Sequence, residues 1–234
     1  MAPSASPTVI VTGATTGIGQ SIARGFARAG EKVLALGVGK LPLDEPNLAY
    51  GELDVQDAAA VQAALSVHDG LRVLVNCAGI IRREAEHDPD VFQQVIDINL
   101  TGSMRACAAA RGKLGANNGC IINIASMLSY FGGGLVPGYS ASKGGVAQLT
   151  KSLAIAYAPD GIRVNALAPG WIATPLTQGL RDDAERSKSL MERTPMGRWG
   201  IPDDLIGPAL FLASPAAGFI TGTILNVDGG YAAM

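Results

Sequence analysis

The sequence has little of what metal centres, disulfide frameworks and membrane spans require. Its 234 residues contain only three cysteines and two histidines. Cys77, Cys107 and Cys120 are odd in number and widely spaced, so we expect three reduced thiols and no metal site. The best apolar stretch, residues 71–81, contains Arg72 and Asn76 and is too short to cross a bilayer. We therefore expect a protein without a membrane span.

An excess of basic residues is also missing. Lys and Arg number 18 against 20 Asp and Glu, and the formal net charge is −2. Because a nucleic-acid-binding protein needs a basic face to neutralise phosphates, we expect no nucleic-acid partner. Residues 1–7 have neither a basic start nor an apolar run, which argues against a secretory signal. Together with the reduced thiols, this predicts a cytoplasmic location.

Apolar residues are plentiful, at 48%, and residues 1–234 suffice for one well-buried domain. Short apolar runs alternate with segments of helical periodicity, which is typical of parallel strands joined by crossover helices. The sequence thus predicts an α/β fold: a single-domain, Rossmann-like, doubly wound parallel sheet of about seven strands with helices on both faces. The predicted strands are residues 9–11, 33–36, 48–53, 72–75, 120–125, 163–167 and 223–227, the predicted helices are 18–30, 57–65, 90–114, 137–157 and 203–213, and residues 171–200 read as polar and irregular.

A glycine-rich turn joins the first predicted strand to the first predicted helix. Residues 12–19 read Thr-Gly-Ala-Thr-Thr-Gly-Ile-Gly, with glycines spaced Gly-x3-Gly-x-Gly. Glycines permit a tight turn and close backbone approach, and the following helix N-terminus offers free N–H groups to a pyrophosphate. A glycine-rich turn alone is weak evidence, but its place between strand and helix predicts dinucleotide binding. The expected contacts are Gly13, Thr15, Thr16, Gly17, Ile18 and Gly19.

A tyrosine and a lysine with helical spacing indicate proton transfer. Tyr139 and Lys143 are four residues apart and share one face of the predicted helix. A phenol is a poor acid–base catalyst at neutral pH, and a neighbouring ammonium group favours the phenolate, so Lys143 is expected to lower the pKa of Tyr139. Ser126, at the end of the fifth predicted strand, is placed to donate a hydrogen bond to a substrate oxygen.

These motifs together resemble the short-chain dehydrogenase/reductase family over essentially the whole chain. The resemblance implies that Asn99, Ser126, Tyr139 and Lys143 are catalytic, with Asn99 supporting a water path from Lys143 to solvent. Residues 99–101 also match a glycosylation sequon, but nothing indicates secretion, and we expect Asn99 to be interior. The resemblance also implies a homotetramer built from the two long helices and residues 228–234. The motifs are residues 12–19, Asn76-Cys-Ala-Gly79, Asn99, Ser126, Tyr139-Ser-Ala-Ser-Lys143, and residues 169–170, 197–200 and 228–230.

The cofactor implied by this family is a nicotinamide dinucleotide. An acidic residue normally ends the second strand and rejects a 2′-phosphate, but here Gly37 stands there. The base that normally binds this phosphate is also missing, since Thr16 occupies its place in the glycine turn. NAD is favoured on that ground, and NADP stays open because Lys40 is near. The further cofactor contacts that the family implies are Gly37, Asp54, Val55, Asn76, Ala78, Gly79, Tyr139, Lys143, Pro169, Gly170, Ile172 and Thr174.

The substrate is expected to be a small organic anion. Residues 79–84, 121–129 and 168–200 are similar to a narrower group, the 2-dehydro-3-deoxy-D-gluconate 5-dehydrogenases and related sugar-acid dehydrogenases. Arginine grips a carboxylate at two points, so Arg82, Arg83 and Arg181 are candidates for its recognition, although Arg82 and Arg83 can equally pair with Glu84 or Glu86. Met127 is a further substrate candidate, and residues 171–200 are expected to cover the substrate.

Other functions remain open from the sequence. The enzyme alternatives are a 3-oxoacyl thioester reductase and another sugar or polyol dehydrogenase. The non-catalytic alternative is a dinucleotide-sensing module that has kept the fold. The complete set of Asn99, Ser126, Tyr139 and Lys143 favours an enzyme.

Overall fold

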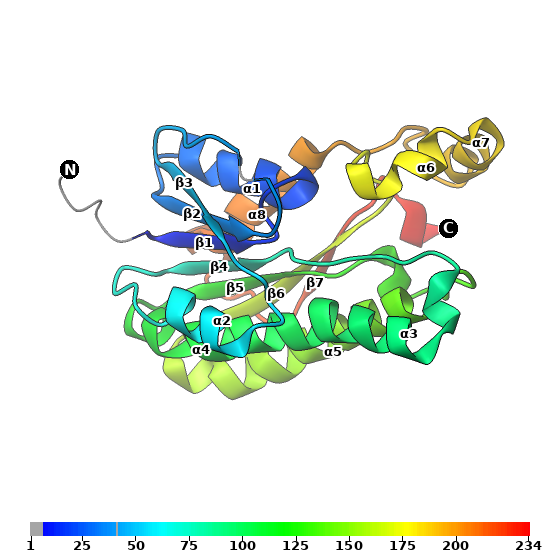
Figure 1. The fold of residues 1–234 in the computed structure, drawn as a ribbon. Helices are drawn as coiled ribbons and strands as arrows, with labels where there is room; N and C mark the ends of the chain where they lie inside the picture. Colours follow the sequence, from blue (N-terminus) through cyan, green and yellow to red (C-terminus); the bar gives the residue numbers. More distant parts are fainter. Residues whose placement is uncertain (1–6, 41) are drawn as a thin grey trace.

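Seven strands form one parallel sheet in the computed structural model, which describes residues 7–40 and 42–234. The strand order is β3-β2-β1-β4-β5-β6-β7, so the chain starts in the middle of the sheet and builds outward in both directions (Figure 1). This order confirms the doubly wound fold. The expectation about a secretory signal falls mainly on residues 1–6, which lie outside the described residues. The strands are β1 (Val9–Thr12), β2 (Val33–Gly37), β3 (Leu48–Glu52), β4 (Val73–Asn76), β5 (Cys120–Ile124), β6 (Arg163–Pro169) and β7 (Ile224–Val227).

Helices cover both faces of the sheet, as predicted. Helices α1 and α8 pack on one face, where Phe26 and Leu212 are buried against alternate strand residues. Helices α2, α4 and α5 cover the other face (Figure 1), with Leu65, Leu114 and Leu153 in a second buried cluster. The helices are α1 (Gly17–Arg28), α2 (Ala58–Leu65), α3 (Pro89–Ile96), α4 (Gly102–Ala116), α5 (Pro137–Tyr157), α6 (Gln178–Arg181), α7 (Ala184–Glu192) and α8 (Ile206–Ala213).

Two predicted segments differ from the structure. The helix expected over residues 90–114 is interrupted by a π-helical turn, Asp97–Thr101, between α3 and α4. A π-turn inserts one residue without breaking the helical course, so sequence periodicity does not reveal it. The segment expected to be irregular, residues 171–200, contains α6 and α7. Asp183 caps α7 because its carboxylate accepts a hydrogen bond from the backbone N–H of Arg186 at 3.1 Å.

The segment 171–200 leaves the sheet and returns to the place where it started. The backbone of Gly200 donates to the carbonyl of Trp171 at 2.9 Å, and Ala173 donates to the carbonyl of Gly200 at 2.8 Å. Both ends of the segment are therefore pinned beside β6. Helices α6 and α7 project from this point over the carboxyl edge of the sheet, near the C-terminus (Figure 1).

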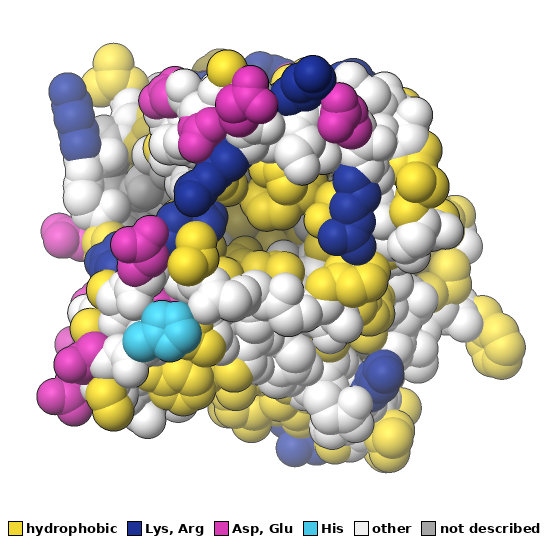
Figure 2. Space-filling model, turned by 90° about the vertical axis from the view of Figure 1, so that its right-hand side faces the viewer, with side chains coloured by type: hydrophobic (Ala, Val, Ile, Leu, Met, Phe, Trp, Pro, Cys, Tyr) yellow, Lys and Arg dark blue, Asp and Glu magenta, His cyan; other side chains and the backbone are white. Residues whose placement is uncertain are grey.

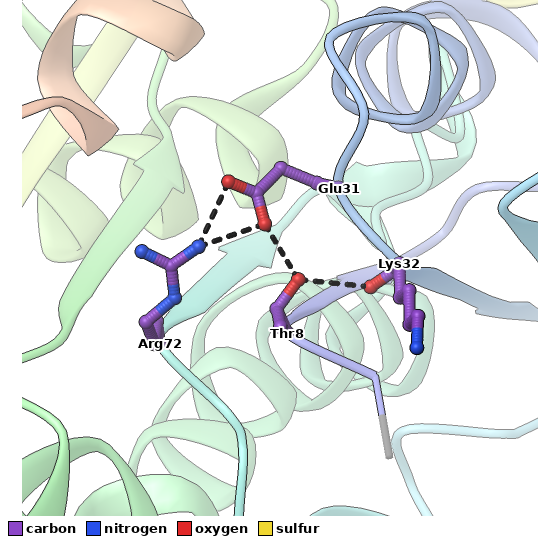
Figure 3. A network of polar contacts seen from close by, with 4 residues as sticks. All are labelled: Thr8, Glu31, Lys32 and Arg72. Carbon is purple, nitrogen blue, oxygen red and sulfur yellow. Dashed lines mark hydrogen bonds and ion pairs between the residues drawn. The ribbon is translucent and has the colours of Figure 1, made fainter. Parts of the chain in front are cut away.

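The opposite, amino edge of the sheet is held by a polar network. Both carboxylate oxygens of Glu31, in the loop before β2, accept from the Arg72 guanidinium at 2.8 Å. The hydroxyl of Thr8 donates to the same carboxylate at 2.6 Å (Figure 3). The network fixes the starts of β1 and β4 together, at the edge away from the catalytic motifs.

No helix in the described part of the chain is long and apolar enough to cross a membrane. Cys77, Cys107 and Cys120 are free thiols. Within residues 7–40 and 42–234, no cluster of three or more His, Cys, Asp or Glu side chains is arranged to hold a metal ion.

Candidate active site

Ser126 and Tyr139 meet at the carboxyl edge of the sheet. Ser126 directly follows Ala125 at the end of β5, and Tyr139 lies in the first turn of α5. Both side chains line one cavity, and the Ser126 hydroxyl is close enough to the phenol to lower the pKa of Tyr139, against the larger, opposite effect of burial. Two residues thirteen positions apart are thus brought together as the sequence predicted.

A short polar relay fixes the orientation of Ser126. The Ser126 hydroxyl oxygen accepts from the backbone N–H of Leu128 at 3.1 Å. The Ser129 hydroxyl accepts from the N–H of Ser126 at 3.3 Å and donates to the carbonyl of Lys143 at 2.7 Å. The serine turn is therefore tied to the helix that carries the tyrosine and the lysine.

Burial sets the protonation of Tyr139 and Lys143. The Lys143 side chain is 5% exposed and its ammonium group donates to the carbonyl of Ile124 at 2.7 Å. Burial lowers the pKa of Lys143 to about 8 and raises the pKa of Tyr139 to about 12. In the protein alone the pKa of Tyr139 is therefore raised, because desolvation of the phenolate dominates, and the lowering effect of Lys143 stays a prediction.

Asn99 is completely buried within the π-helical turn, in agreement with the expected interior position. Its side chain donates to the carbonyl of Ile80 at 3.0 Å and accepts from the N–H of Ile80 at 2.8 Å. It also donates to the Ser142 hydroxyl at 3.0 Å. Asn99 thus holds the chain that follows β4 against α5. A Cβ atom at Gly79 would lie 3.3 Å from the Asn99 oxygen and 3.7 Å from the Lys143 nitrogen, which brings these three residues together.

Glu86 is a buried carboxylate beside the catalytic turn that sequence reasoning did not select. Its carboxylate is buried, 1% exposed, and accepts from the backbone N–H of Tyr139 and from that of Arg82, both at 2.7 Å. A carboxylate at the N-terminus of a helix is stabilised by the helix dipole. Glu86 therefore couples the segment after β4 to the catalytic turn of α5. It binds the backbone of Arg82 rather than an arginine side chain, and its place in a polar run gave no sign of burial.

A cavity of about 380 Å³ lies between the glycine turn and the catalytic helix. Predicted cofactor residues from the two halves of the chain meet in its wall, together with Cys77, which the sequence reasoning did not select. The predicted residues that line it are Gly13, Thr16, Gly17, Ile18, Gly19, Gly79, Tyr139, Lys143 and Thr174.

The glycine turn has the geometry that a pyrophosphate needs. Gly13 has a left-handed φ of 64°, and a Cβ atom there would lie 2.4 Å from the backbone nitrogen of Ala78. A Cβ atom at Gly19 would lie 2.3 Å from the carbonyl oxygen of Gly13. The Thr16 side chain makes no capping hydrogen bond with any described residue, so it does not occupy the first N–H groups of α1. The residues present therefore fit a dinucleotide.

The remaining cofactor candidates lie outside that cavity. A Cβ atom at Gly37 would lie 3.0 Å from the Thr15 side chain, which places both at the ends of β2 and β1. Asp54 follows β3, and its carboxylate accepts from the N–H of Gln56 at 2.9 Å. The side chain of Val55 is buried, and a Cβ atom at Gly102 would lie 2.7 Å from it.

The nicotinamide-side candidates lie at the end of β6 and directly after it. Pro169 and Gly170 line the adjoining cavity described below, and Ile172 is buried, with 4% of its surface exposed. One expectation needs correction. The Asn76 side chain does not reach the cofactor cavity, because it is buried and donates to the Asn123 oxygen at 2.9 Å inside the core.

A second cavity, of about 320 Å³, adjoins the first and contains both Ser126 and Tyr139. Figure 2 shows a hollow on this face, with hydrophobic side chains inside and basic side chains on two sides of the opening. Met127, a predicted substrate residue, belongs to its wall. Leu176, Thr177 and Leu180 of the segment 171–200 also line it, so this segment forms one side of the cavity.

The arginines divide into those that line this cavity and those that do not. Arg83 lines it, as predicted. Arg82 is exposed and its guanidinium donates to the carbonyl of Ile81 at 3.4 Å, while Arg181 donates to the side chain of Gln178. Neither of these belongs to the lining, and their part in substrate binding stays a prediction. Arg193, which the sequence reasoning did not select, lines the cavity instead.

The chain is similar to known dehydrogenases over nearly its whole length. A family model described as enoyl-(acyl carrier protein) reductase matches residues 13–232. The 2-dehydro-3-deoxy-D-gluconate 5-dehydrogenase of Bacillus subtilis (strain 168) is 42% identical over 238 residues, covering 96% of this chain and 94% of the relative.

Solved structures agree with this chain in fold and in sequence. A protein from Agrobacterium tumefaciens, described as a 2-deoxy-D-gluconate 3-dehydrogenase with bound NADP, has a TM-score of 0.90 and 43% identity, covering 97% of this chain and 96% of that one. A gluconate 5-dehydrogenase from Burkholderia cenocepacia J2315, in complex with NADP and tartrate, has a TM-score of 0.88 and 35% identity, covering 97% and 95%. The chain therefore belongs to the short-chain dehydrogenase/reductase family and is an oxidoreductase that acts on CH–OH groups.

Proposed function

We propose that the protein transfers a hydride between a nicotinamide cofactor and a hydroxyl or keto group of a 2-keto-3-deoxy sugar acid, in carbohydrate catabolism. One observation carries this proposal: the cavity that holds Ser126 and Tyr139 also exposes Arg83, a cation suited to a carboxylate. The name of the B. subtilis relative and the tartrate in the B. cenocepacia structure, itself a hydroxy acid, support an acidic substrate.

Ser126 and Tyr139 handle the proton of the reacting group. The Ser126 hydroxyl donates a hydrogen bond to the substrate oxygen, and Tyr139 exchanges a proton with it. Because the pKa of Tyr139 is raised to about 12, the phenol is protonated at neutral pH and is ready to donate its proton to a carbonyl oxygen. Lys143 and Asn99 support the proton path behind the tyrosine. The bound nicotinamide supplies or accepts the hydride and, when oxidised, carries a positive charge that favours the phenolate.

The glycine turn holds the pyrophosphate in this proposal. Gly37, Asp54 and Val55 lie toward the adenosine. Ala78 and Gly79, after β4, approach the ribose. The nicotinamide end is held at the end of β6 and beyond it by Pro169, Gly170, Ile172 and Thr174, beside Tyr139 and Lys143.

The nucleotide is either NAD or NADP, and we propose that NADP is accepted. Gly37 presents no carboxylate to repel a 2′-phosphate, and Val38 after it is 57% exposed. The A. tumefaciens and B. cenocepacia relatives were both solved with NADP, which weighs against the preference for NAD that the sequence suggested. Thr16 adds no cation to the glycine turn, so affinity for NAD is expected as well.

Val38→Asp is expected to turn the enzyme toward NAD. A carboxylate at this exposed position repels the 2′-phosphate and can accept from a ribose hydroxyl, so kcat/KM with NADP should fall at least about tenfold, with little change for NAD. Val38→Asn serves as the neutral control of the same shape. If Val38→Asp and Val38→Asn change the ratio of kcat/KM with NADP to kcat/KM with NAD equally, this placement of the adenosine is contradicted.

Glu86→Gln is expected to shift the pH profile of alcohol oxidation to lower pH. The Glu86 charge raises the pKa of Tyr139, so its removal lowers that pKa and keeps the phenolate available at lower pH. The Glu86 carboxylate accepts from two backbone N–H groups, and in Gln the amide NH₂ faces one of them without a hydrogen bond. The free energy of unfolding should therefore fall by about 1.5–3 kcal/mol. Measured profiles of kcat/KM against pH, with exposed Glu84→Gln as control, test this. If the pH dependence of kcat/KM is unchanged in Glu86→Gln, Glu86 contributes to packing and not to the pKa of Tyr139.

A substrate screen tests the proposed function directly. Sugar acids, neutral polyols and 3-oxoacyl thioesters are each assayed with NAD(H) and NADP(H). The family-model description favours an acyl thioester reductase as the second candidate. Turnover of acyl thioesters in preference to every sugar acid would reverse the order of the two candidates, and no turnover of any alcohol or ketone would favour a dinucleotide sensor.

The assembly and the location are further parts of this proposal. A homotetramer is supported by exposed apolar side chains on the long helices, where Ile155 is 79% and Met104 is 37% exposed, and by Met234 in the C-terminal segment, at 70%. Sedimentation equilibrium at micromolar concentration tests it, and a monomer would contradict it. A cytoplasmic location is supported by the three free thiols.

A further inference from the structure

Arg193 is held by two aromatic rings from distant parts of the chain. It follows α7, and its guanidinium carbon lies 4.3 Å from the centre of the Tyr231 ring and 5.2 Å from that of Phe131. The two rings themselves meet edge to face, with their centres 6.1 Å apart. A long, flexible side chain is thereby confined to one place, by the turn after β5 on one side and the C-terminal turn on the other.

The charge of Arg193 is left for a ligand. Six other arginines pair with carboxylates, whereas neither Arg193 nor Arg83 forms an ion pair with any residue between 7 and 234 that the structure describes. Both line the cavity that contains Ser126 and Tyr139. The guanidinium lies over both rings and donates no hydrogen bond to the part of the chain that the structure describes, so its N–H groups are available for two parallel hydrogen bonds.

Arg83 and Arg193 reach this cavity from different elements. Arg83 lies in the segment between β4 and α3, which Glu86 and Asn99 anchor to the catalytic helix. Arg193 lies in the segment 171–200, whose ends are pinned beside β6.

We propose that Arg193 determines specificity for acids by binding the substrate carboxylate together with Arg83. This inference rests on the proposed function and adds to it a residue that recognises the negative charge of the substrate. Ser126 and Tyr139 then engage the hydroxyl or keto group of a molecule whose carboxylate is fixed by the two arginines. A neutral sugar of the same length leaves both guanidinium groups without a partner, so the site discriminates by charge.

The test compares two inhibitors that differ only in charge. D-Gluconate and D-gluconamide have the same carbon chain, with a carboxylate or an amide at the first carbon. Their inhibition constants are measured against 2-dehydro-3-deoxy-D-gluconate and NADP⁺ in the wild-type enzyme and in Arg193→Met. Methionine keeps an apolar stem against Tyr231 and Phe131 but carries no charge. Arg186→Met, which removes an exposed arginine paired with Asp183 at 3.4 Å, is the matched control.

In Arg193→Met the inhibition constant of D-gluconate is expected to rise by about ten- to a hundredfold, because a charge-assisted hydrogen bond is lost. The KM for the sugar acid should rise by a similar factor. D-Gluconamide should change by less than about threefold, as should both inhibitors in the Arg186 control. Arg193→Lys keeps a charge without the planar fork, so its loss should be intermediate. Melting temperatures and NADPH affinities of all variants show whether the fold and the cofactor site are intact.

Each other outcome identifies what failed. If the inhibition constants of D-gluconate and D-gluconamide rise equally in Arg193→Met, Arg193 shapes the cavity wall and does not bind the carboxylate. If Arg83→Met separates the two inhibitors and Arg193→Met does not, the Arg193 assignment is wrong and the proposed function stands. If the wild-type enzyme turns over neutral polyols but no sugar acid, the proposed substrate class fails, and the role of Arg193 fails with it.

Discussion

Replacing Tyr139 with phenylalanine is expected to lower kcat for the sugar acid by at least about a hundredfold, because positioned acid–base groups contribute that much or more. Phenylalanine fills the same space but cannot exchange a proton. The Ser126 hydroxyl keeps its contact with the N–H of Leu128. The catalytic geometry therefore survives while the proton carrier is removed.

Affinity for the nucleotide should hardly change in this variant. The glycine turn is built from other elements, and Tyr139 is only one of the residues that line the cofactor cavity. NADPH titrations followed by fluorescence, together with single-turnover rates, separate binding from chemistry. Tyr130→Phe is the matched control, because Tyr130 is 49% exposed and its hydroxyl donates to Asn226 at 3.2 Å. A Tyr139→Phe enzyme with more than about a tenth of the normal kcat would rule out Tyr139 as the acid–base group.

The fold was predictable because each strand is a compact apolar run between turns. Strands such as β2 and β5 are almost wholly buried, so their hydrophobic sequence is required by helices on both faces. The π-helical turn around Asn99 was not predictable in the same way. Helical periodicity continues through it, and only the buried contacts of Asn99 with Ile80 and Ser142 show what the turn achieves.

The catalytic pair was predictable from spacing, but its electrostatics were not. Four residues of helix bring Tyr139 and Lys143 to one face whatever surrounds them. The direction of a pKa shift depends on how far each group is removed from water, and this depends on the whole fold. The pKa of Lys143 is lowered and the pKa of Tyr139 is raised, and helical spacing alone reveals neither shift.

The substrate arginines were only partly predictable, for a similar reason. Arg83 follows a strand at the edge where ligands bind, which the sequence indicates. Arg193 is more than a hundred residues away, and its place depends on where the segment 171–200 returns and where Tyr231 packs. Arg82 and Arg181 have the same chemistry as Arg83, but one turns to its own backbone carbonyl and the other to a neighbouring side chain.

Gly13→Ala is expected to have the second large effect, on both stability and nucleotide binding. The residue has φ of 64°, which costs an alanine about 1–2 kcal/mol. Its Cβ atom would also lie 2.4 Å from the nitrogen and 2.5 Å from the Cα atom of Ala78, and backbone atoms cannot step aside as a flexible side chain can. The turn and the segment after β4 must separate, and overpacking of this kind costs about 1–3 kcal/mol more.

Gly30→Ala separates the two causes. Gly30, after α1, also has a left-handed φ, of 90°, but a Cβ atom there would meet none of the described residues within 4 Å. It should lose about 1–2 kcal/mol of unfolding free energy and keep its affinity for the nucleotide. Gly13→Ala should lose about 2–5 kcal/mol and at least about a hundredfold in affinity, since the N–H groups of the turn no longer converge on the pyrophosphate. Denaturant unfolding and NADPH titration measure both quantities. If Gly13→Ala binds NADPH as tightly as the wild-type enzyme does, the pyrophosphate binds away from this turn, because displacement of the turn's backbone would weaken any nucleotide bound there.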